Sequence, residues 1–563
     1  EKRAPYPTKK VTRRKPLFSP RMLHSGYCLD EYPDEHLSAI AHAGRDAILV
    51  FTVEANKTPC GFLDFNELIH RAAKYGLDVY AYSYIHTNVH PDEPNAKEVY
   101  DSLYGRVFKE CPGLKGITLV GESVEFASKD PRVCKPGGDY DSNEVPSGKP
   151  RPGWFPCNDF PQWIELVRDS VRKYRPDADI VFWTYNWGWA PKKERIELIE
   201  NMPTDVSLLC TFEMFHKYKV ENITEYCSDY SLVFEGPGEY FTSEAEAAKK
   251  RGIKLYSMTN TGGLTWDMGT IPYEPMPYQW IKRYKGMLSA NKVYGLCGIM
   301  ESHHFGFYPS FIGDLSNLAL SDTEMTMEEH LKHILIKHFG KDNEVMVDEA
   351  LMLWSEAITH FAPANEDQYG PFRVGPSYPL CLRRVVNVPA PDYAHFGSRI
   401  CYTDYPKYPS NDFPLNTAGT LRIPVEIRSL TKAKDLMVRG INILEAIENK
   451  NGELLKLINL GKYIETIIAT GINVKKWYIT KTKLLIEQDK SEISRLFTKL
   501  EAIAEAELKN AESAIEFVEK DSRLGWEPSM EYVGDKAAIE WKIRQLKYTI
   551  SKEIPDYKAS FER

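Results

Sequence analysis

No segment of this 563-residue chain approaches the ~20 consecutive apolar residues of a membrane-spanning helix, and none resembles the apolar core of a secretory signal. The formal net charge is only −8, so the chain lacks the basic excess that favours nucleic-acid binding. We therefore predict no membrane span and no nucleic-acid partner. The chain begins at Glu1 rather than Met, from which we expect that an upstream signal or domain has been removed and that the protein is secreted or periplasmic.

Cysteine is scarce and its spacing is uninformative. The ten cysteines form no CxxC pair and no cluster with metal-ligand spacing. Cys134 and Cys157 flank a loop rich in Gly and Pro and are candidates for a disulfide, whereas isolated buried thiols are expected elsewhere. Cysteine usage alone does not decide the compartment.

Several catalytic signatures are also missing. The sequence contains no GxSxG elbow, P-loop, HExxH or GxGxxG. Serine hydrolases of the elbow type, NTPases, zincins and dinucleotide-dependent dehydrogenases are therefore disfavoured. We predict no cofactor.

A repeated unit does occur: eight times between residues 21 and 310, a short apolar run precedes a stretch with helical spacing. The apolar runs are nearly continuous, as expected for parallel strands covered by helices on the outside. Eight such units predict an α/β fold, a (β/α)8 TIM barrel, over an open doubly wound sheet. The expected strands are 21–27, 46–53, 78–85, 116–126, 179–187, 206–215, 253–260 and 295–302, with 230–236 as a possible extra strand.

Beyond the barrel the pattern changes to long helices, so we predict a C-terminal α-helical domain. Apolar residues recur at steps of three and four along 490–520, which suits one face of a bundle and leaves a homodimer through this region open. The predicted organisation is 1–20 as an extended basic arm, 21–320 as the barrel, 321–362 as a helical extension, 363–430 as an irregular segment rich in Pro, Gly and Tyr, and 431–563 as a helical bundle.

Carboxylates stand where the apolar runs end, and Glu122 and Glu125 are the first pair. In a barrel the C-terminal ends of the strands converge on one face, where such folds carry their chemistry. Glycoside hydrolysis needs one carboxylic acid for the leaving oxygen and a second carboxylate as base or nucleophile. We predict Glu122 or Glu125 as the acid, and Glu213 or Glu301 as the second catalytic carboxylate.

His303 and His304 directly follow Glu301, but neighbouring strand residues are expected to diverge and the usual metal-ligand spacing is absent. We therefore predict no metal. The chain has 33 Tyr and 11 Trp, whose faces suit sugar rings, while amides and imidazoles bond to hydroxyls. The predicted carbohydrate-binding residues are His24, Tyr27, His86, Asn88, Tyr185, Asn186, Trp187, Asn260, Trp266, Asp267, His303 and His304.

Three segments carry a family resemblance: RMLHSGYCLDE from residue 21, GITLVGESVEF from residue 116 and GLCGIMESHHFGFYPSFIGDLSNLAL from residue 295. Over residues 21–361 the chain resembles glycoside hydrolases of the bacterial α-glucuronidase type and their relatives from polysaccharide-degrading bacteria. The resemblance implies a barrel glycosidase with an inverting reaction, in which the fourth-strand acid falls on Glu122 or Glu125 and Glu213 lies near one water-activating position.

The chain departs from that family at two places. The seventh strand ends in Thr259 and Asn260 rather than a carboxylate, and TYNWGW replaces the arginine expected after the fifth strand. Hexosaminidases with similar barrels place an Asp-Glu pair on the fourth strand, where this chain has Glu122 and Ser123. We predict a glycoside hydrolase acting on a poly- or oligosaccharide; the alternatives are a glycan-binding barrel without catalysis and a uronate lyase or epimerase.

Overall fold

The computed structural model describes residues 15–26, 30–123, 127–134, 149–226, 229–361, 365–382, 388, 416–527 and 532–561. Eight parallel strands close into a barrel, with each strand bonded to its neighbour in the chain and the last bonded to the first. This confirms the predicted TIM barrel. In order around the barrel the strands are β2 (Arg21–His24), β3 (Ala47–Thr52), β6 (Asp78–Ser83), β7 (Gly116–Val120), β8 (Asp179–Trp183), β9 (Ser207–Thr211), β12 (Lys254–Met258) and β13 (Leu296–Ser302).

The barrel strands are buried on both faces because side chains fill the interior and helices cover the outside. Every residue of β3, β7 and β9 is buried, which accounts for their continuous apolar sequences. The surrounding helices are α1 (Asp34–His42), α2 (Phe65–Lys74), α3 (Ala96–Tyr100), α4 (Arg106–Glu110), α5 (Phe160–Arg172), α6 (Lys192–Asn201), α7 (Glu239–Arg251), α8 (Pro277–Tyr294) and α9 (Phe311–Ala319).

Short two-stranded sheets lie outside the barrel sheet, in the loops of the barrel and in the helical region. They pair β1 (Lys15–Pro16) with β14 (Ser321–Asp322), β4 (Lys57–Thr58) with β5 (Gly61–Phe62), β10 (Lys217–Val220) with β11 (Ile223–Tyr226), and β15 (Trp526–Glu527) with β16 (Tyr532–Val533). The possible strand at 230–236 is not a strand: the connection from β9 to α7 contains the β10–β11 hairpin instead.

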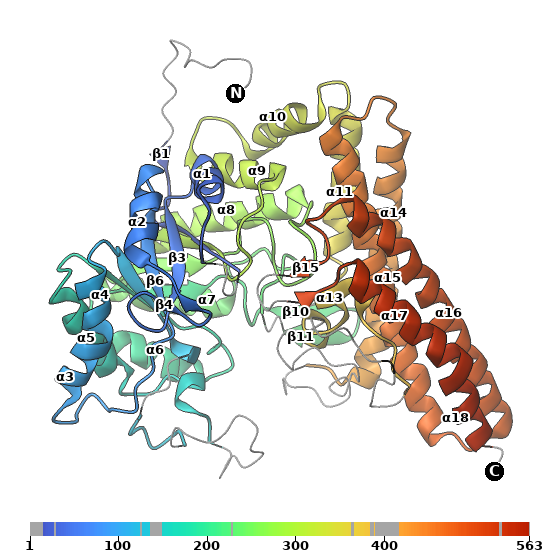
Figure 1. Cartoon of the computed structure of the whole chain (residues 1–563), viewed down its shortest axis with the longest axis horizontal. Helices are drawn as coiled ribbons and strands as arrows, with labels where there is room; N and C mark the ends of the chain where they lie inside the picture. Colours follow the sequence, from blue (N-terminus) through green and yellow to red (C-terminus); the bar gives the residue numbers. More distant parts are fainter. Residues whose placement is uncertain are drawn as a thin grey trace.

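The helical region lies to one side of the barrel, and its long helices run beside one another (Figure 1). It comprises α10 (Met327–Phe339), α11 (Glu344–Ile358), α12 (Asn365–Gln368), α13 (Pro371–Val374), α14 (Gly419–Ala446), α15 (Gly452–Ile486), α16 (Lys490–Lys520), α17 (Lys536–Tyr548) and α18 (Ile554–Ser560). Helix α16 has the bounds that its apolar spacing predicts. Helix α14 begins within the segment predicted to be irregular and continues through Pro424.

Buried ion pairs lie between this region and the barrel and also within the region. Arg422 of α14 contacts Glu225 of β11 across 2.9 Å, and Lys475 of α15 contacts Asp367 of α12 across 2.7 Å. A buried charge is stable only when it is paired, so the first contact fixes α14 against the β10–β11 hairpin and the second fixes α12 against α15.

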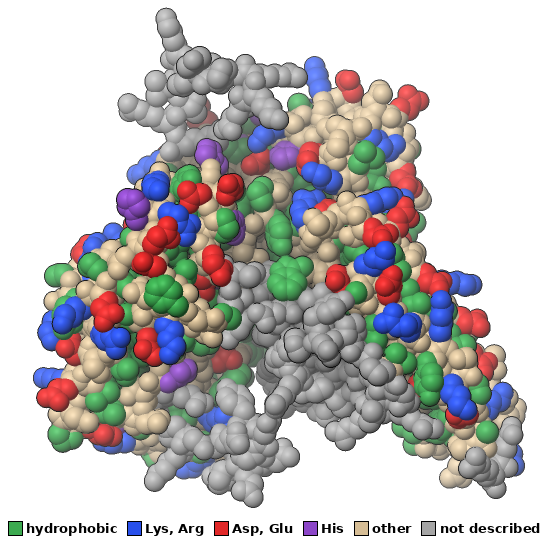
Figure 2. Space-filling view, in the orientation of Figure 1, with side chains coloured by type: hydrophobic (Ala, Val, Ile, Leu, Met, Phe, Trp, Pro, Cys, Tyr) green, Lys and Arg blue, Asp and Glu red, His purple; other side chains and the backbone are tan. Residues whose placement is uncertain are grey.

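Cys134 and Cys157 are both free, so the suggested disulfide between them is wrong. No helix in the described residues is long and apolar enough to cross a membrane. Acidic and basic side chains are interspersed on the face drawn in Figure 2, without a large patch of one sign among the described residues. Most of the N-terminal arm lies outside the described residues, and the domain boundaries and the homodimer stay predictions.

Candidate active site

Glu122 lies in a short helical turn, Gly121–Ser123, directly after β7 at the C-terminal end of the barrel. The turn packs against the indole of Trp187, so that a Cβ on Gly121 would lie 2.5 Å from a Trp187 ring carbon. Glycine is therefore required before Glu122, because any side chain would displace the turn. Trp187 itself is buried, and its indole N–H donates to the Gly153 carbonyl across 3.0 Å.

The Glu122 side chain is half-buried and contacts the end of the next strand. The Asn186 amide, which follows β8, donates to Oε1 of Glu122 across 3.3 Å. Desolvation by the surrounding protein, together with the nearby Asp229 carboxylate, raises the pKa of Glu122 to about 8. Glu122 is thus a protonated carboxylic acid at neutral pH, although part of its side chain remains exposed.

Asp229 is the second carboxylate of this group, and it is not among the residues predicted from the sequence. It is buried in the connection between the β10–β11 hairpin and α7, and its two oxygens accept hydrogen bonds from Tyr185 across 3.1 Å and Tyr369 across 2.8 Å. Burial raises the pKa of Asp229 to about 6, while the tyrosine hydroxyls and the charge of Arg373 oppose that rise. No apolar run ends at Asp229, so the strand pattern offered no signal for it.

Glu122 and Asp229 therefore differ in their pKa values, and Asp229 lies close enough to raise the pKa of Glu122. The first has a pKa near 8 and the second near 6. Pairs of carboxyl groups whose environments separate their pKa values are the usual arrangement of acid and base in a hydrolytic site. Between pH 6 and 8 this pair offers one proton donor and one anion.

The helical region supplies one wall of the site. Tyr369 follows α12 and is half-buried, and its ring meets the edge of Trp266 at 5.4 Å. The Arg373 guanidinium lies 4.3 Å from the centre of the Trp266 ring and pairs with Glu527 across 3.0 Å. Trp266 thus packs under a cation and beside Tyr369, rather than standing exposed as a sugar platform.

Three imidazoles, His24, His303 and His304, gather at the ends of β2 and β13. The rings of His303 and His304 lie 4.0 Å apart, and those of His24 and His304 lie 4.5 Å apart. One nitrogen from each of the three side chains lies within 4.8 Å of the other two. The expectation that neighbouring histidines diverge is therefore wrong, because His304 has a φ of +65° and leaves the strand conformation.

Hydroxyl groups flank the His303 ring of this cluster on both sides. The Tyr82 hydroxyl lies 3.1 Å from Nε2 of His303, and the Tyr230 hydroxyl lies 3.0 Å from Nδ1. Burial, followed by the effect of the neighbouring imidazoles, lowers the pKa of His24 and of His303 well below the ordinary value. Both rings are therefore neutral at physiological pH.

Glu213 lies beside Arg283 and close to a further carboxylate, Asp267. It is fully buried after β9, pairs with Arg283 across 3.2 Å, and has its pKa raised by burial to about 7. Asp267 accepts hydrogen bonds from the Leu232 backbone across 2.7 Å and from Ser231, and burial raises its pKa to about 6. The Arg283 charge opposes the rise in the pKa of Glu213, and the Asp267 carboxylate adds to it.

Glu301 is held in a structural ion-pair network. Its carboxylate contacts Arg21 across 2.5 Å and Arg45 across 2.9 Å, and it accepts a hydrogen bond from Ser316 of α9. The two guanidinium groups outweigh burial and hold the pKa of Glu301 at about 2. Both carboxylate oxygens of Glu301 are thus paired with guanidinium groups, an arrangement that suits a structural role.

The remaining predicted residues are dispersed. His86 and Asn88 are exposed in the loop after β6. Asn260 is buried, and its Oδ1 accepts from the His303 backbone N–H across 3.3 Å. Tyr27 and Glu125 lie outside the described residues. The structure therefore brings Glu122, Tyr185 and Asn186 together with Asp229, and separates them from Glu301.

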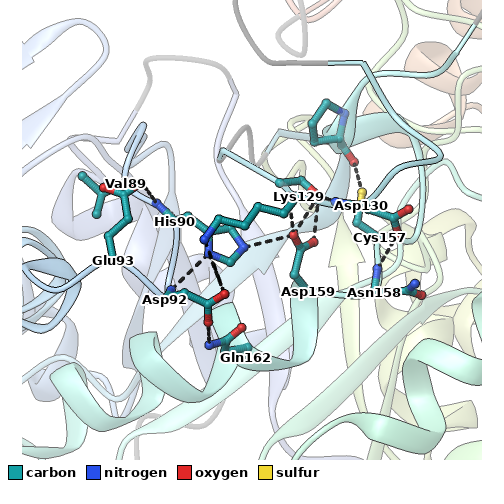
Figure 3. Close-up of polar contacts among 12 residues, drawn as sticks. Val89, His90, Asp92, Glu93, Lys129, Asp130, Cys157, Asn158, Asp159 and Gln162 are labelled. Atoms are coloured by element: carbon teal, nitrogen blue, oxygen red, sulfur yellow. Dashed lines mark hydrogen bonds and ion pairs between the residues drawn. The ribbon is translucent and has the colours of Figure 1, made fainter.

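A polar cluster around Asp159 anchors the loop that follows Glu122 (Figure 3). Asp159 accepts from the Ser128 hydroxyl across 2.8 Å and from the Lys129 backbone across 2.7 Å, and His90 Nε2 lies 3.1 Å from the same carboxylate. Because the serine contacts the aspartate and not the histidine, this is no serine-hydrolase triad. Its effect is to tie the loop after β7 to the loop after β6.

Comparison with known proteins leaves the family undecided. No family model matches the chain, and no curated protein does. Among solved structures, a mutant O-GlcNAc hydrolase of Thermobaculum terrenum is 12% identical, with 96% of this chain and 97% of that chain covered and a TM-score of 0.38. A thermostable mutant xylanase from Cellvibrio japonicus is 13% identical over 50% of this chain and 85% of that chain, with a TM-score of 0.30.

A phospho-2-dehydro-3-deoxyheptonate aldolase from Thermotoga maritima is 11% identical over 50% of this chain and 59% of that chain, with a TM-score of 0.25. The three structures belong to proteins with different chemistries. Scores at this level assign neither a family nor an activity to this chain.

Proposed function

We propose that this protein is a glycoside hydrolase in which Glu122 is the general acid and Asp229 the second catalytic carboxylate. The observation that carries the proposal is the pair itself. Two carboxyl groups share the mouth of a closed barrel, and their environments separate their pKa values to about 8 and about 6. Glycosidases use two carboxyl groups in opposite protonation states in this way.

The roles follow from the surroundings of each group. Glu122 is protonated and half-exposed, so it can deliver its proton to the leaving oxygen of a bound glycoside. Asp229 is ionised above pH 6, and the hydroxyls of Tyr185 and Tyr369 hold both of its oxygens. In the proposed mechanism the anion stabilises the positive charge that develops at the anomeric carbon, either as a base toward water or as a nucleophile.

The walls of the site suit a neutral sugar. Asn186 and Tyr369 are half-buried beside the two carboxyl groups and offer amide and hydroxyl partners together with an aromatic edge. The nearby cation, Arg373, is paired with Glu527 and stacked on Trp266. A uronate carboxylate would have to compete with that pair, so we propose a neutral glycoside rather than a glucuronide.

The test is turnover of a panel of aryl glycosides and oligosaccharides. Turnover is measured as the release of phenol from the aryl glycosides or of reducing ends from the oligosaccharides. We expect Glu122→Gln and Asp229→Asn each to lower kcat/KM by about 10²–10⁴-fold, the range for loss of acid–base catalysis. The matched control is Glu165→Gln, which changes an exposed glutamate on α5 and should leave kcat/KM within about two-fold of the wild type.

Three outcomes would contradict the proposal. Binding of glycans without turnover by any of the proteins would indicate a glycan-binding barrel. Unsaturated uronate products, or epimerised sugars without cleavage, would indicate a lyase or an epimerase. Turnover that survives both substitutions would show that other residues carry the reaction.

We also propose that the protein is secreted or periplasmic. Cys60 is disulfide-bonded, and such bonds persist mainly in oxidising compartments. Mass spectrometry after alkylation without reduction should leave Cys60 unmodified in protein isolated from its native source. Alkylated Cys60 in that sample would contradict the proposal.

A further inference from the structure

Three histidine side chains converge in the floor of the barrel mouth, and the proposed hydrolase mechanism uses none of them. His24 ends β2, and His303 and His304 follow β13, the strand that pairs with β2. All three side chains are buried, with exposed fractions of 0%, 3% and 8%. One ring nitrogen of each lies within 4.8 Å of the other two.

The backbone is bent to make this arrangement. In a regular strand, side chains of consecutive residues point to opposite faces, which would separate His303 from His304. The φ of +65° at His304 removes that alternation, and the two rings meet at 4.0 Å. A left-handed conformation at a residue other than Gly is unfavourable and is concentrated at functional sites.

His24 supplies the second independent observation. Its side chain is completely buried, yet neither Nδ1 nor Nε2 has a hydrogen-bond partner among the described residues. The centre of its ring lies 4.4 Å from the centre of the Phe51 ring and 4.3 Å from that of the Tyr82 ring. Buried polar groups of this kind nearly always have a partner, and here the unpartnered nitrogens lie beside two further imidazoles.

We propose that His24, His303 and His304 bind a divalent transition-metal ion. In tetrahedral coordination at the usual metal–nitrogen distance of ~2.0–2.1 Å, ligand nitrogens lie about 3.3 Å apart. The three nitrogens, all within 4.8 Å of one another, can reach that spacing by small ring rotations.

The donor set selects the kind of ion. Three imidazole nitrogens without a carboxylate suit Zn²⁺, Co²⁺, Ni²⁺ or Cu²⁺, whereas Ca²⁺ and Mg²⁺ require oxygen ligands. His303 has a tyrosine hydroxyl at each ring nitrogen, from Tyr82 and Tyr230. One nitrogen can turn to the metal while the other keeps its hydroxyl partner, which orients the ring.

The test uses the full chain, stripped with a chelator and titrated with Co²⁺ followed by visible absorption, and with Zn²⁺ followed by equilibrium dialysis. We expect one ion per chain and visible bands of imidazole-bound Co²⁺. His24→Phe keeps an aromatic ring in the aromatic pocket but removes a ligand, and should weaken binding by about 100-fold or more. The control is His86→Asn, which changes an exposed histidine after β6 and should bind as the wild type does.

A second variant keeps the test decisive if the first variant does not fold. If His24→Phe does not fold, as judged by its circular dichroism, His304→Asn replaces it, with the same loss expected. Added Zn²⁺ should raise the Tm of the wild type and of His86→Asn, but not that of a ligand variant. Absence of stoichiometric binding by the wild type, or unchanged affinity in the folded ligand variants, would overturn the proposal.

The metal proposal does not depend on the hydrolase proposal. Glu122→Gln leaves all three imidazoles in place, so it should lower kcat/KM by about 10²–10⁴-fold while Co²⁺ binding is unchanged. Failure of either proposal is therefore measured separately from failure of the other.

Discussion

The Tyr369 hydroxyl donates a hydrogen bond to Oδ2 of Asp229 across 2.8 Å, although the two residues are 140 positions apart in the chain. The helical region thus contributes a side chain to the mouth of the barrel and is more than an appended domain. The same segment contributes Arg373, which stacks on Trp266, and Gln368, which donates to the Tyr230 carbonyl across 2.8 Å. Function at this site therefore depends on how the helical region docks.

The two carboxyl groups predict a bell-shaped dependence of kcat/KM on pH. The acid, Glu122, loses its proton as the pH rises through about 8, and the anion, Asp229, gains one as the pH falls through about 6. Activity should therefore be highest between these values, which belong to the pair as a whole. In Glu122→Gln the residual activity should lose the alkaline limb, and in Asp229→Asn the acidic limb. A wild-type profile that is flat from pH 5 to 9 would contradict both assignments.

Tyr369→Phe removes one hydroxyl that stabilises the Asp229 anion. Because hydrogen bonds to a charged group contribute about 1.5–3 kcal/mol, we expect the pKa of Asp229, and with it the acidic limb, to move upward by about one to two units. The control is Tyr218→Phe, whose hydroxyl donates to the Thr359 carbonyl, outside the site. Equal pH profiles for the two variants would show that the tyrosine contact has no electrostatic role.

Gly121→Ala tests how the turn positions Glu122. The new methyl group would lie 2.5 Å from the Trp187 ring, so the turn must shift. We expect a loss of about 1–3 kcal/mol in the free energy of unfolding and a fall in kcat of about 100-fold, as for a misplacement near 1 Å. Gly452→Ala is the control, since a Cβ there meets nothing within 4 Å.

The Gly121 effect should be partly reversed by a second substitution. Trp187→Phe removes the ring atoms that the new methyl group would strike, so the double variant should recover activity relative to Gly121→Ala alone. Strictly additive losses in the double-mutant cycle would show that the two residues do not act on one another.

Glu301→Gln should destabilise the fold without acting on the chemical step. Breaking a buried ion pair leaves Arg21 and Arg45 without their anion and costs about 3–5 kcal/mol. Urea unfolding at pH 7 measures this loss, and Glu328→Gln, at an exposed pair with Lys285, should cost less than about 1 kcal/mol. Retention of wild-type stability would contradict the structural role.

The same ion pair has a predictable pH dependence. The folded-state pKa of Glu301 is about 2, below its ordinary value of 4.5. The ionised Glu301 carboxylate therefore makes its full contribution to the free energy of unfolding above pH 4.5. That contribution is lost as the pH falls toward 2. The stability difference between the wild type and Glu301→Gln should narrow over that interval.

Most of the barrel could be predicted from the sequence because each strand and each helix has a characteristic hydrophobic pattern within its own short stretch of residues. A run such as 116–120 is apolar throughout since both faces are covered, and the acidic residue after it marks the mouth of the barrel. This reasoning located Glu122, the apolar face of α16 and all eight strands. It did not locate Asp229, which follows a polar hairpin and has no periodic neighbours.

The amino-acid sequence by itself determined the closed barrel, the long helices and the position of Glu122, because burial imposes period and apolarity on each element separately. Only the tertiary structure decided which carboxylates share a site. It turned Glu301 toward two arginines, placed Tyr369 on Asp229, and brought His303 and His304 together through one left-handed residue. Such contacts join segments that are distant in the chain, or depend on a single backbone angle, and leave no periodic trace in the sequence.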